Sequence, residues 1–436
     1  MQKNELAKIT SFTQLKNEFL KCMLTFANGN MNSKRILIVT NRVPYPLKDG
    51  GNLAMYGMIE GYHNAGWDVM LLSMNTSRHY VPTEELPELF SNIRFESFDI
   101  DTDIKIFPSL KNYVFSKQPN QVERFFNKGF EKKLIECIDQ FDPEIIQLES
   151  IYLQAYLSSI RETTKAIVVT RLHNIEHQIW ERLASETPNR FKRIYLKDLA
   201  ARIKRFELQS WKDADLLIPI TDADARLVKE LEIKTPLHVA AFGIDAGKYV
   251  NTHEEEKWIG YHIGAMDWLP NVDAVTWFLE EVWKELHKEI PEFEFHFAGR
   301  NMPGSFKKYE GDNIVCAGEV PDAKVFIADK KILIVPLKAA SGIRVKIVEA
   351  IAAEKLVIST GIGVQGINGL ENGKHFLLAE TADDFIRQIK FALRHKEEAK
   401  NIASAGAQHI KEACDQRKIT ACLCEKINAL MNMKKY

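Results

Sequence analysis

Short runs of hydrophobic residues alternate along the chain with longer segments in which hydrophobic residues recur every three or four positions. In the first half, such runs occupy residues 36–40, 69–73, 145–148, 166–170 and 216–220. The second half repeats the pattern at residues 258–263, 292–298, 313–317, 332–336, 356–360 and 375–379. Runs of this length predict buried strands, and the segments between them predict helices. Their alternation predicts α/β architecture, with parallel sheets covered by helices on both faces.

Three predicted helices bear on the organisation of the chain. Residues 52–65 form one, bracketed by Gly50-Gly51 and Gly66. Residues 190–212 form a long one with hydrophobic positions along one side. In the segment 272–286 hydrophobic residues fall at helical spacing, and Asn271 is the predicted N-cap.

At 436 residues the chain is long for one hydrophobic core, so we expect two domains of about 200 residues each. The pattern places them at residues 34–245 and 257–415, joined by a charged linker at 246–256. Residues 1–33 contain no clear strand, and Met31 stands directly before the first domain. We therefore expect an N-terminal extension that is either not native or loosely attached. Residues 416–436 form a last helix.

The composition is that of an ordinary globular protein, with 45% hydrophobic and 27% charged residues. A net charge of -1 provides no overall attraction for nucleic acid or an anionic membrane, so any such contact must be local. The six cysteines form no Cys-x-x-Cys pair, which favours reduced thiols in a cytoplasm. The sequence shows no run of 18 apolar residues and no signal peptide, and we expect a soluble, cytoplasmic protein.

The long helix predicted at residues 190–212 is rich in lysine and arginine. Two interpretations are open: peripheral contact with anionic lipid at the inner face of a membrane, or a solvated charged face. Asp198 and Glu207 interrupt the basic run, which favours the solvated face.

The segment after the strand at 332–336 has the features of a phosphate site. It reads Ser-Gly-Ile-Arg-Val-Lys-Ile-Val-Glu-Ala from Ser341, and a helix begins within it. Gly342 lets the backbone approach a ligand, while Arg344 and Lys346 add positive charge to a helix N-terminus. Glu349 lies about one and a half turns further on, where a carboxylate suits the two hydroxyls of a ribose. The alternative is an amphipathic helix with solvated charges.

Two further motifs follow predicted strands in the first half. Gly50 and Gly51 open a helix, and positive φ angles there would direct N–H groups at a phosphate or sugar. His173-x-x-Glu176-His177 fits the H-x-x-E-H pattern of one class of zinc peptidase. His173 directly follows a strand, however, in a loop with poor metal geometry, at the sheet edge where open α/β sheets bind ligands.

In the second half, Gly264 and Arg300 end predicted strands on the same edge. Gly264 leaves room for a phosphate or base, whereas Trp268 is expected to pack in the core. Arg300 is expected either to approach a nucleotide or to be a solvated surface arginine. Neither first strand is followed by Gly-x-Gly-x-x-Gly, which argues against a dinucleotide-dependent dehydrogenase.

These motifs together resemble the family 4 glycosyltransferases, retaining enzymes of the GT-B architecture, and specifically a branch with the motif Ser-Gly-Ile-Arg-x-Lys-x-x-Glu-Ala. The resemblance covers nearly everything after Met31. Ser341 occupies the place where many relatives carry the first of two glutamates, and Glu349 matches the second. The resemblance implies two doubly wound Rossmann-like domains facing a cleft, with the last helix crossing back onto the first domain.

The resemblance also implies a function and its residues. A sugar would pass from a nucleoside-diphosphate sugar to an acceptor hydroxyl, with a saccharide or lipid-linked acceptor from cell-envelope synthesis. Arg344 and Lys346 would stabilise the leaving diphosphate, and His173 would orient the sugar. The remaining implied contacts are Glu349, Ser341, Gly342, Gly264 and Arg300 for the donor, and Gly50, Gly51 and Asn174 for the acceptor or cleft loop. No metal is required, because lysine and arginine supply the charge and no Asp-x-Asp motif suitable for a metal appears. A sugar-nucleotide epimerase of the same architecture and a catalytically silent nucleotide-binding scaffold are the alternatives.

Overall fold

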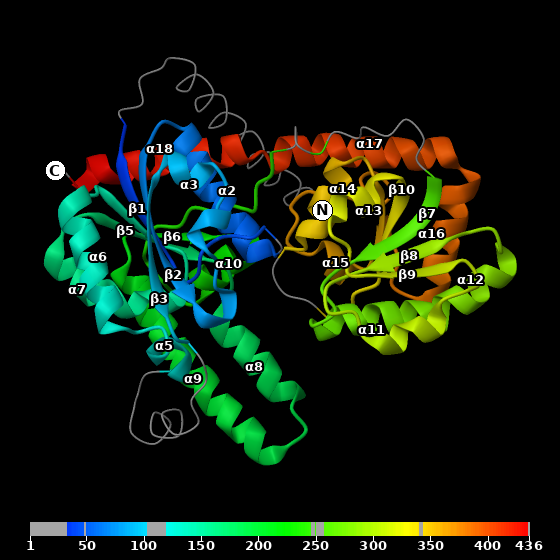
Figure 1. The fold of residues 1–436 in the computed structure, drawn as a ribbon, viewed down its shortest axis with the longest axis horizontal. Coiled ribbons are helices and arrows are strands. Elements are labelled where there is room, and N and C mark those ends of the chain that lie inside the picture. Colours follow the sequence, from blue (N-terminus) through cyan, green and yellow to red (C-terminus); the bar gives the residue numbers. More distant parts are fainter. Residues whose placement is uncertain are drawn as a thin grey trace, which may run out of the picture. The chain divides into compact units, whose positions relative to one another are not determined.

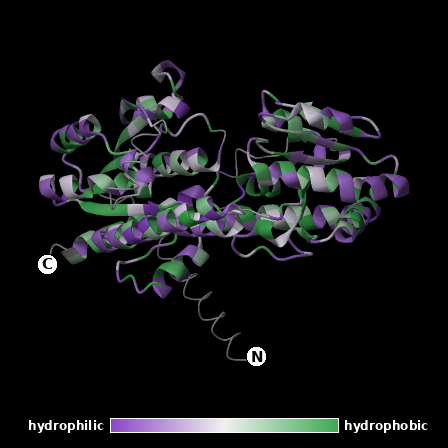
Figure 2. Cartoon of the chain, turned by 90° about the horizontal axis from the view of Figure 1, so that it is seen from below, coloured by the Kyte–Doolittle hydropathy of each residue, from purple (hydrophilic) through white to green (hydrophobic). Residues whose placement is uncertain are grey.

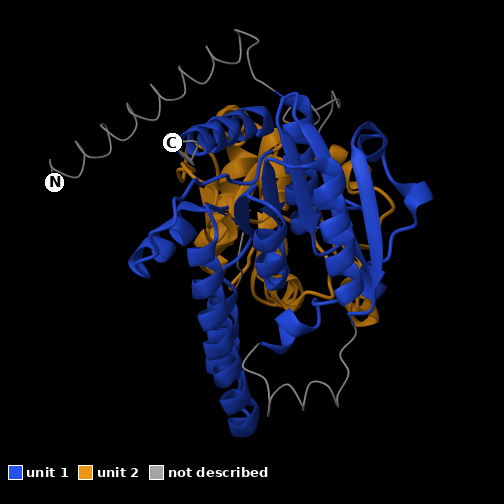
Figure 3. Ribbon diagram, turned by 90° about the vertical axis from the view of Figure 1, so that its left-hand side faces the viewer, with its two compact units in different colours: residues 1–243, 416–436 blue, residues 244–415 orange. Residues whose placement is uncertain are grey.

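The structure, a computed structural model, describes residues 33–47, 49–102, 119–245, 249, 257–339 and 343–434. The chain divides into two compact units (Figure 3). Unit 1 runs to Gly243 and resumes at Gln416, and unit 2 spans Ile244–Asp415. The expected extension at 1–33 lies almost wholly outside the described residues, as does the expected linker at 246–256 apart from Tyr249.

Unit 1 is built on a six-stranded parallel sheet in the order β3-β2-β1-β4-β5-β6. The strands are β1 (Arg35–Thr40), β2 (Asp68–Thr76), β3 (Arg94–Ile100), β4 (Ile145–Leu148), β5 (Ile167–Leu172) and β6 (Leu216–Pro219). All five predicted strands are confirmed. The edge strand β3 was missed because its residues are only partly buried and it alternates polar with hydrophobic positions. Its register places Met70 beside Arg94 and Thr76 beside Ile100.

Helices cover both faces of this sheet (Figure 1). On one face lie α2 (Gly50–Asn64) and α18 (Gln416–Lys434), whose Met58 and Leu423 share a buried core with Ile36 and Ile38 of β1. On the other face lie α6 (Lys128–Phe141) and α7 (Leu157–Thr163). The shorter elements are η1 (Ser77–His79), η2 (Thr83–Glu85), α3 (Leu89–Asn92), α5 (Asn120–Glu123), η3 (Ile151–Tyr156) and α10 (Asp222–Glu230).

The C-terminal helix α18 packs against α2 through glycines. A Cβ atom added at Gly61 would lie 2.2 Å from Oγ1 of Thr420, and one added at Gly57 would lie 3.1 Å from Oε1 of Gln416. The missing side chains therefore let the two helix backbones approach closely.

Two antiparallel helices, α8 (Glu176–Glu186) and α9 (Arg190–Asp213), form a hairpin that projects from the body of unit 1 (Figures 1 and 3). α9 confirms the long helix predicted at residues 190–212. None of the helices in the described ranges has the length and apolar content needed to cross a membrane.

Unit 2 repeats the topology of unit 1. Its sheet has the order β12-β11-β10-β7-β8-β9 and is parallel throughout. The strands are β7 (Lys257–Ile263), β8 (Phe295–Ala298), β9 (Ile314–Gly318), β10 (Lys330–Val335), β11 (Leu356–Ser359) and β12 (Leu377–Leu378). All six predicted strands are confirmed. In each unit the first and fourth strands are neighbours, so both units are doubly wound and Rossmann-like.

The helices of unit 2 are α11 (Leu269–Trp277), α12 (Lys284–Glu289), α13 (Ala323–Ala328), α14 (Val345–Ala352), α15 (Gly361–Val364), α16 (Ala382–Arg394) and α17 (Lys396–Ala413), with a 3-10 turn η6 (Gly304–Tyr309). A π-helical segment, η5 (Phe278–Trp283), joins α11 to α12. Hydrophobic residues gather in the strands and on the helix faces turned toward them (Figure 2).

The start of α11 corrects two predictions. The helix begins at Leu269, with Trp268 in the cap position, so Asn271 lies inside the first turn and is not the N-cap. The amide of Asn271 instead contacts the loop after β7, where its Nδ2 donates to the carbonyl of Ala265 at 2.8 Å. Trp268 is 38% exposed and does not belong to the core.

Candidate functional site

Each sheet changes its direction of winding between its first and fourth strands, and ligands of doubly wound folds bind at the carboxyl ends of these strands. In unit 1 the loops after β1 and β4 meet there. In unit 2 the equivalent loops follow β7 and β10. The side chains at these two places are described separately, because each belongs to one unit.

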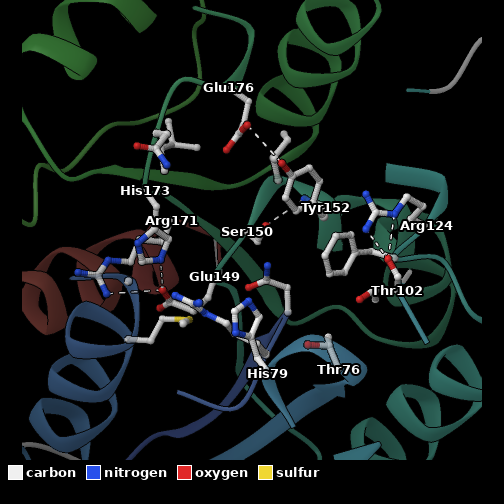
Figure 4. A pocket seen from close by; sticks show the side chains of 18 of the residues that line it. Thr76, His79, Thr102, Arg124, Glu149, Ser150, Tyr152, Arg171, His173 and Glu176 are labelled. Carbon is white, nitrogen blue, oxygen red and sulfur yellow. Dashed lines mark hydrogen bonds and ion pairs between the residues drawn. The ribbon is translucent and has the colours of Figure 1, made fainter. Parts of the chain in front are cut away.

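Unit 1 contains a cavity of about 350 Å³ at this position (Figure 4). Segments that follow five strands line it: Asn41 and Arg42 after β1, Arg78 and His79 after β2, Thr102 after β3, Glu149 to Tyr152 after β4, and His173 and Asn174 after β5. The cavity walls also include Gly51, Arg124, Arg171, Glu176 and Glu207. Two predicted residues, His173 and Asn174, therefore share one cavity with Gly51.

A buried carboxylate holds His173 in place. Nε2 of His173 lies 2.7 Å from Oε2 of Glu149, whose side chain is fully buried. Nη1 of Arg171 lies 3.5 Å from the same oxygen. Gln147 donates to Oε1 of Glu149 at 2.5 Å and accepts from the hydroxyl of Tyr62 at 2.7 Å. Burial alone would raise the pKa of Glu149, but Arg171 and His173 outweigh it, so the pKa is lowered and the carboxylate is charged.

A pair of carboxylates, Glu176 and Glu207, lies at the base of the helical hairpin. Glu207 of α9 is buried, and its carboxylate accepts hydrogen bonds from the backbone N–H groups of Glu176 and His177, both at 2.9 Å. It thereby caps the N-terminus of α8. Burial, followed by the nearby charge of Glu207, raises the pKa of Glu176 to about 7. The hydroxyl of Tyr152 donates to Oε2 of Glu176 at 3.2 Å (Figure 4).

The H-x-x-E-H motif does not bring its histidines together on one metal site. His173 contacts Glu149, whereas Nδ1 of His177 lies 2.5 Å from Oε2 of Glu207. In the part of the chain that the structure describes, no group of three or more His, Cys, Asp or Glu side chains is arranged to hold a metal ion.

The two glycines at the start of α2 do not have the predicted backbone conformation. Neither Gly50 nor Gly51 has a positive φ angle. Asp49 caps the helix, and its Oδ1 accepts from the N–H groups of Gly51 at 2.9 Å and Asn52 at 3.0 Å. Arg42 pairs with the same oxygen at 2.6 Å. The amide of Gly51 is thus bound within the protein and not free for a phosphate.

In unit 2, Lys346 lies in the first turn of α14 with all three ammonium hydrogens engaged. Its Nζ donates to Nε2 of His262 at 3.1 Å, to the carbonyl of Ile263 at 3.0 Å and to Oδ1 of Asn271 at 3.0 Å. Nδ1 of His262 donates to the carbonyl of Ile334 at 2.9 Å, which leaves Nε2 as the acceptor. Burial, with Arg344 as the second cause, lowers the pKa of Lys346 to about 7.

Arg344 is the N-cap residue of α14 and is buried. Its Nε donates to the carbonyl of Gly363 at 3.0 Å, and its Nη2 donates to the carbonyl of Gln365. Nη1 is buried without a hydrogen-bond partner among the described residues. Burial lowers the pKa of Arg344 to about 10, so it is positively charged at neutral pH. Ser341 and Gly342, which precede it, lie outside the described residues.

Glu349 lies one turn beyond Lys346 on α14. Its Oε1 accepts a hydrogen bond from the hydroxyl of Tyr249 at 2.8 Å. Burial raises the pKa of Glu349, although this hydrogen bond and the charge of Lys324 act in the opposite direction. No motif pointed to Tyr249, which comes from a segment expected to be a linker.

The other two predicted donor residues have structural partners. A Cβ atom added at Gly264 would lie 2.6 Å from Nδ2 of Asn271, so glycine is needed there for the protein's own packing. Arg300 pairs with Asp267 at 3.2 Å on the surface, which matches the solvated alternative.

The sequence analysis did not identify the residues that hold the predicted ones in place. These are Glu149, Glu176, Glu207, His262 and Asn271, the last as a hydrogen-bond acceptor for Lys346. Glu149 and His262 had an available signal. Glu149 directly follows a hydrophobic strand at the ligand-binding edge, and His262 lies within one. Glu207 was read as part of a solvated face because the pattern of a helix does not reveal which neighbour covers it.

Known proteins resemble this chain in two ways: a family matches part of unit 2, and individual proteins match nearly the whole chain. Residues 259–395 match the family described as glycosyl transferases group 1. A Klebsiella pneumoniae protein described as an uncharacterised 44.6 kDa protein in the cps region is 22% identical over 401 residues, covering 88% of this chain and 97% of its own.

Solved structures with the same fold are more distant in sequence. Anabaena Alr3699/HepE, solved in complex with UDP, is 14% identical with a TM-score of 0.62, and the alignment covers 91% of this chain and 100% of that one. Sucrose-phosphate synthase from Thermosynechococcus elongatus is 14% identical with a TM-score of 0.66, covering 92% and 100%. The chain therefore has the GT-B fold, and the family match over residues 259–395 supports a GT-B glycosyltransferase.

Proposed function

We propose that this protein is a retaining glycosyltransferase that moves a sugar from a nucleoside-diphosphate sugar to an acceptor hydroxyl. The observation that carries the proposal is the pair of basic residues, buried Arg344 and partly buried Lys346, at the N-terminus of α14 inside the segment that matches the family. UDP is the first donor nucleotide to test, because Anabaena Alr3699/HepE is described in complex with UDP. The relative from a cps region favours cell-envelope polysaccharide or glycolipid synthesis.

The donor diphosphate would be held by the N-terminus of α14. Nη1 of Arg344 is a buried donor that lacks a partner among the described residues, and a phosphate oxygen would satisfy it. Lys346 would exchange one of its three protein acceptors for a second phosphate oxygen. As the bond between the sugar C1 and the phosphate oxygen breaks, the electron pair leaves on the diphosphate. Preorganised positive charge stabilises that developing charge, so we propose that no divalent cation is required.

Glu349 would bind the ribose of the donor. Its carboxylate accepts a hydrogen bond from Tyr249, and two ribose hydroxyls would replace that contact. Burial raises the pKa of Glu349, and hydrogen bonds donated by the ribose would favour the charged carboxylate.

The acceptor would occupy the cavity of unit 1. Carboxylates suit sugar hydroxyls, and Glu176 supplies one on the cavity wall. The stacked rings of Phe125 and Tyr152, with centroids 4.9 Å apart, offer an apolar surface for a sugar ring. His173, oriented by Glu149, would bind a hydroxyl of the transferred sugar. In the transfer step the acceptor oxygen bonds to C1 on the face from which the diphosphate departs, and its proton passes to the departing phosphate oxygen.

A thermal-shift panel of nucleoside diphosphates and nucleotide sugars tests the donor site. We expect one diphosphate series to raise the melting temperature of the wild type, and Glu349→Ala to lose this shift. Glu281→Ala, which removes an exposed carboxylate of the same unit, serves as the control and keeps the shift. The absence of any shift with the wild type would overturn the donor assignment.

Turnover separates transfer from the two alternatives. Release of nucleoside diphosphate that depends on an acceptor, with the product anomer unchanged, is the result expected of a retaining transferase. Conversion of the nucleotide sugar to its epimer without an acceptor would identify an epimerase instead. Binding without any turnover in the presence of candidate acceptors would identify a scaffold.

A further inference from the structure

The tip of the α8–α9 hairpin, defined here as residues 182–197, exposes large hydrophobic side chains. Phe191 is 83% exposed, Ile194 is 55% exposed and Leu183 is 42% exposed. Tyr195 is also exposed. These are four of the twelve exposed large hydrophobic residues in the described chain, and they fall within a stretch of 13 residues. Such a concentration at the end of a projecting hairpin marks an interaction surface (Figure 3).

The same tip carries a local positive charge. Residues 182–197 contain five lysines and arginines and a single acidic residue, Glu186, whereas the whole chain has a net charge of -1. Arg190, Lys192 and Lys197 are exposed. Phe191, Ile194 and Tyr195 follow helical spacing in the first turns of α9, so basic side chains flank a hydrophobic stripe.

The acidic residues that interrupt the basic run in the sequence do not offset this charge. Glu207 is buried at the base of the hairpin, where it caps α8. Asp198 pairs with Arg202 at 2.7 Å. The solvated face favoured by the sequence rested on these two carboxylates, and the structure directs both of them to partners within the protein.

We propose that the hairpin tip docks onto the surface of an anionic lipid bilayer. A helix end with aromatic and aliphatic residues flanked by lysine and arginine fits an interface in which side chains enter the headgroup region and basic groups meet anionic lipid. A second copy of the chain fits less well, because two tips of the same positive charge repel each other.

The position of the hairpin connects this surface to the cavity of unit 1. Glu176, the first residue of α8, lines the cavity, and the tip lies at the other end of the helix. Eleven residues of α-helix span about 16 Å. Docking would thus hold the cavity within about 16 Å of the bilayer surface along this helix, a distance suited to an acceptor carried on a lipid.

Vesicle co-sedimentation of the full chain tests the proposal. The probes are vesicles of phosphatidylcholine alone and of phosphatidylcholine mixed with phosphatidylglycerol. We expect the wild type to sediment with the mixed vesicles, less so at high salt, and not with phosphatidylcholine alone. Phe191→Ser combined with Ile194→Ser should weaken vesicle binding about tenfold or more. The control, Val325→Ser, removes a hydrophobic residue that is 73% exposed in unit 2 and should leave binding unchanged.

A charge variant tests the electrostatic part. Arg190→Glu with Lys192→Glu should abolish binding to the mixed vesicles, whereas Lys400→Glu with Lys411→Glu on α17 changes the net charge equally and should not. Equal sedimentation of the tip variants and the wild type, or no sedimentation of the wild type, would overturn the proposal. Conversion of a wild-type dimer to a monomer by the tip variants, without vesicle binding, would assign the surface to a second copy. The nucleotide thermal shift is measured on the same variants and should be unchanged, so failure here is distinguishable from failure of the donor site.

Discussion

The affinity for UDP should fall as the pH rises above 7, because the ammonium of Lys346 is about half deprotonated at pH 7 before the ligand binds and loses more protons above it. Burial lowers the pKa of its ammonium from 10.5 to about 7. A bound diphosphate favours the charged form and raises that pKa again. Binding above pH 7 must therefore take up a proton, and the cost of protonation grows with pH.

The size of the effect follows from the two protonation states. At pH 7 about half of the unliganded molecules carry neutral Lys346, so binding should take up about 0.5 proton. Between pH 7 and pH 9 the affinity should fall about 50-fold, approaching tenfold per pH unit, provided that the pKa of the complex exceeds 9. UDP contributes little over this range, because a terminal phosphate whose second pKa is about 6 is already mostly ionised at pH 7.

Isothermal titration calorimetry in buffers of different ionisation enthalpy measures both the affinity and the proton uptake. Lys346→Met keeps an unbranched side chain, one atom shorter and without the charge, and should bind UDP more weakly at pH 7, with no further fall toward pH 9. Lys400→Met, a change on the exposed surface of α17, should retain the wild-type profile. A wild-type affinity that is independent of pH, or an unchanged decline in Lys346→Met, would refute the role given to this ammonium.

Three further predictions concern packing and buried charge. Glu149→Ala leaves a buried arginine without its counter-charge and should lower the free energy of unfolding of unit 1 by about 3 kcal/mol, measured by urea denaturation; a change within error would contradict the buried pair. Gly264→Ala places a Cβ 2.6 Å from Nδ2 of Asn271 and should weaken UDP binding by displacing an acceptor of the lysine, measured by calorimetry; unchanged affinity would contradict it. Gly61→Ala should lower the melting temperature, because its Cβ would lie 2.2 Å from Oγ1 of Thr420, and adding Thr420→Ala should restore part of the loss; equal melting temperatures of the single and double variants would contradict the contact.

The fold was predictable because its central strands are continuous hydrophobic runs. Strands buried on both faces, such as β1 and β10, leave a signal that needs no knowledge of their neighbours. The edge strand β3 lacks this signal, since one side is open and its side chains are only partly buried. The alternation with helices predicted parallel, doubly wound sheets, whereas the order of the strands within each sheet comes from the structure.

Residues of the candidate site were predictable only where the helix or strand next to them in the sequence determines their position. Arg344 and Lys346 stand at a helix N-terminus, and His173 directly follows a strand, so sequence placed them at the correct edges. Their partners come from distant segments: Glu149 lies 24 residues from His173, and Tyr249 lies 100 residues from Glu349. Long-range contacts of this kind depend on tertiary packing, which a single sequence does not display.

The two units use one topology with different charges at the same place. At the switch point of unit 2 the basic groups of Arg344 and Lys346 lie at the start of α14, where they favour a ligand that brings negative charge. At the switch point of unit 1 charges of both signs meet, because Glu149, Glu176 and Glu207 line the cavity together with Arg42, Arg78, Arg124 and Arg171. A diphosphate leaving group fits the first arrangement, and a hydroxyl acceptor fits hydrogen-bonding groups of both kinds. These charges support the proposal that the donor binds unit 2 and the acceptor binds unit 1, and removing the positive charge of Arg344 and Lys346 should abolish transfer while leaving acceptor binding in unit 1 intact.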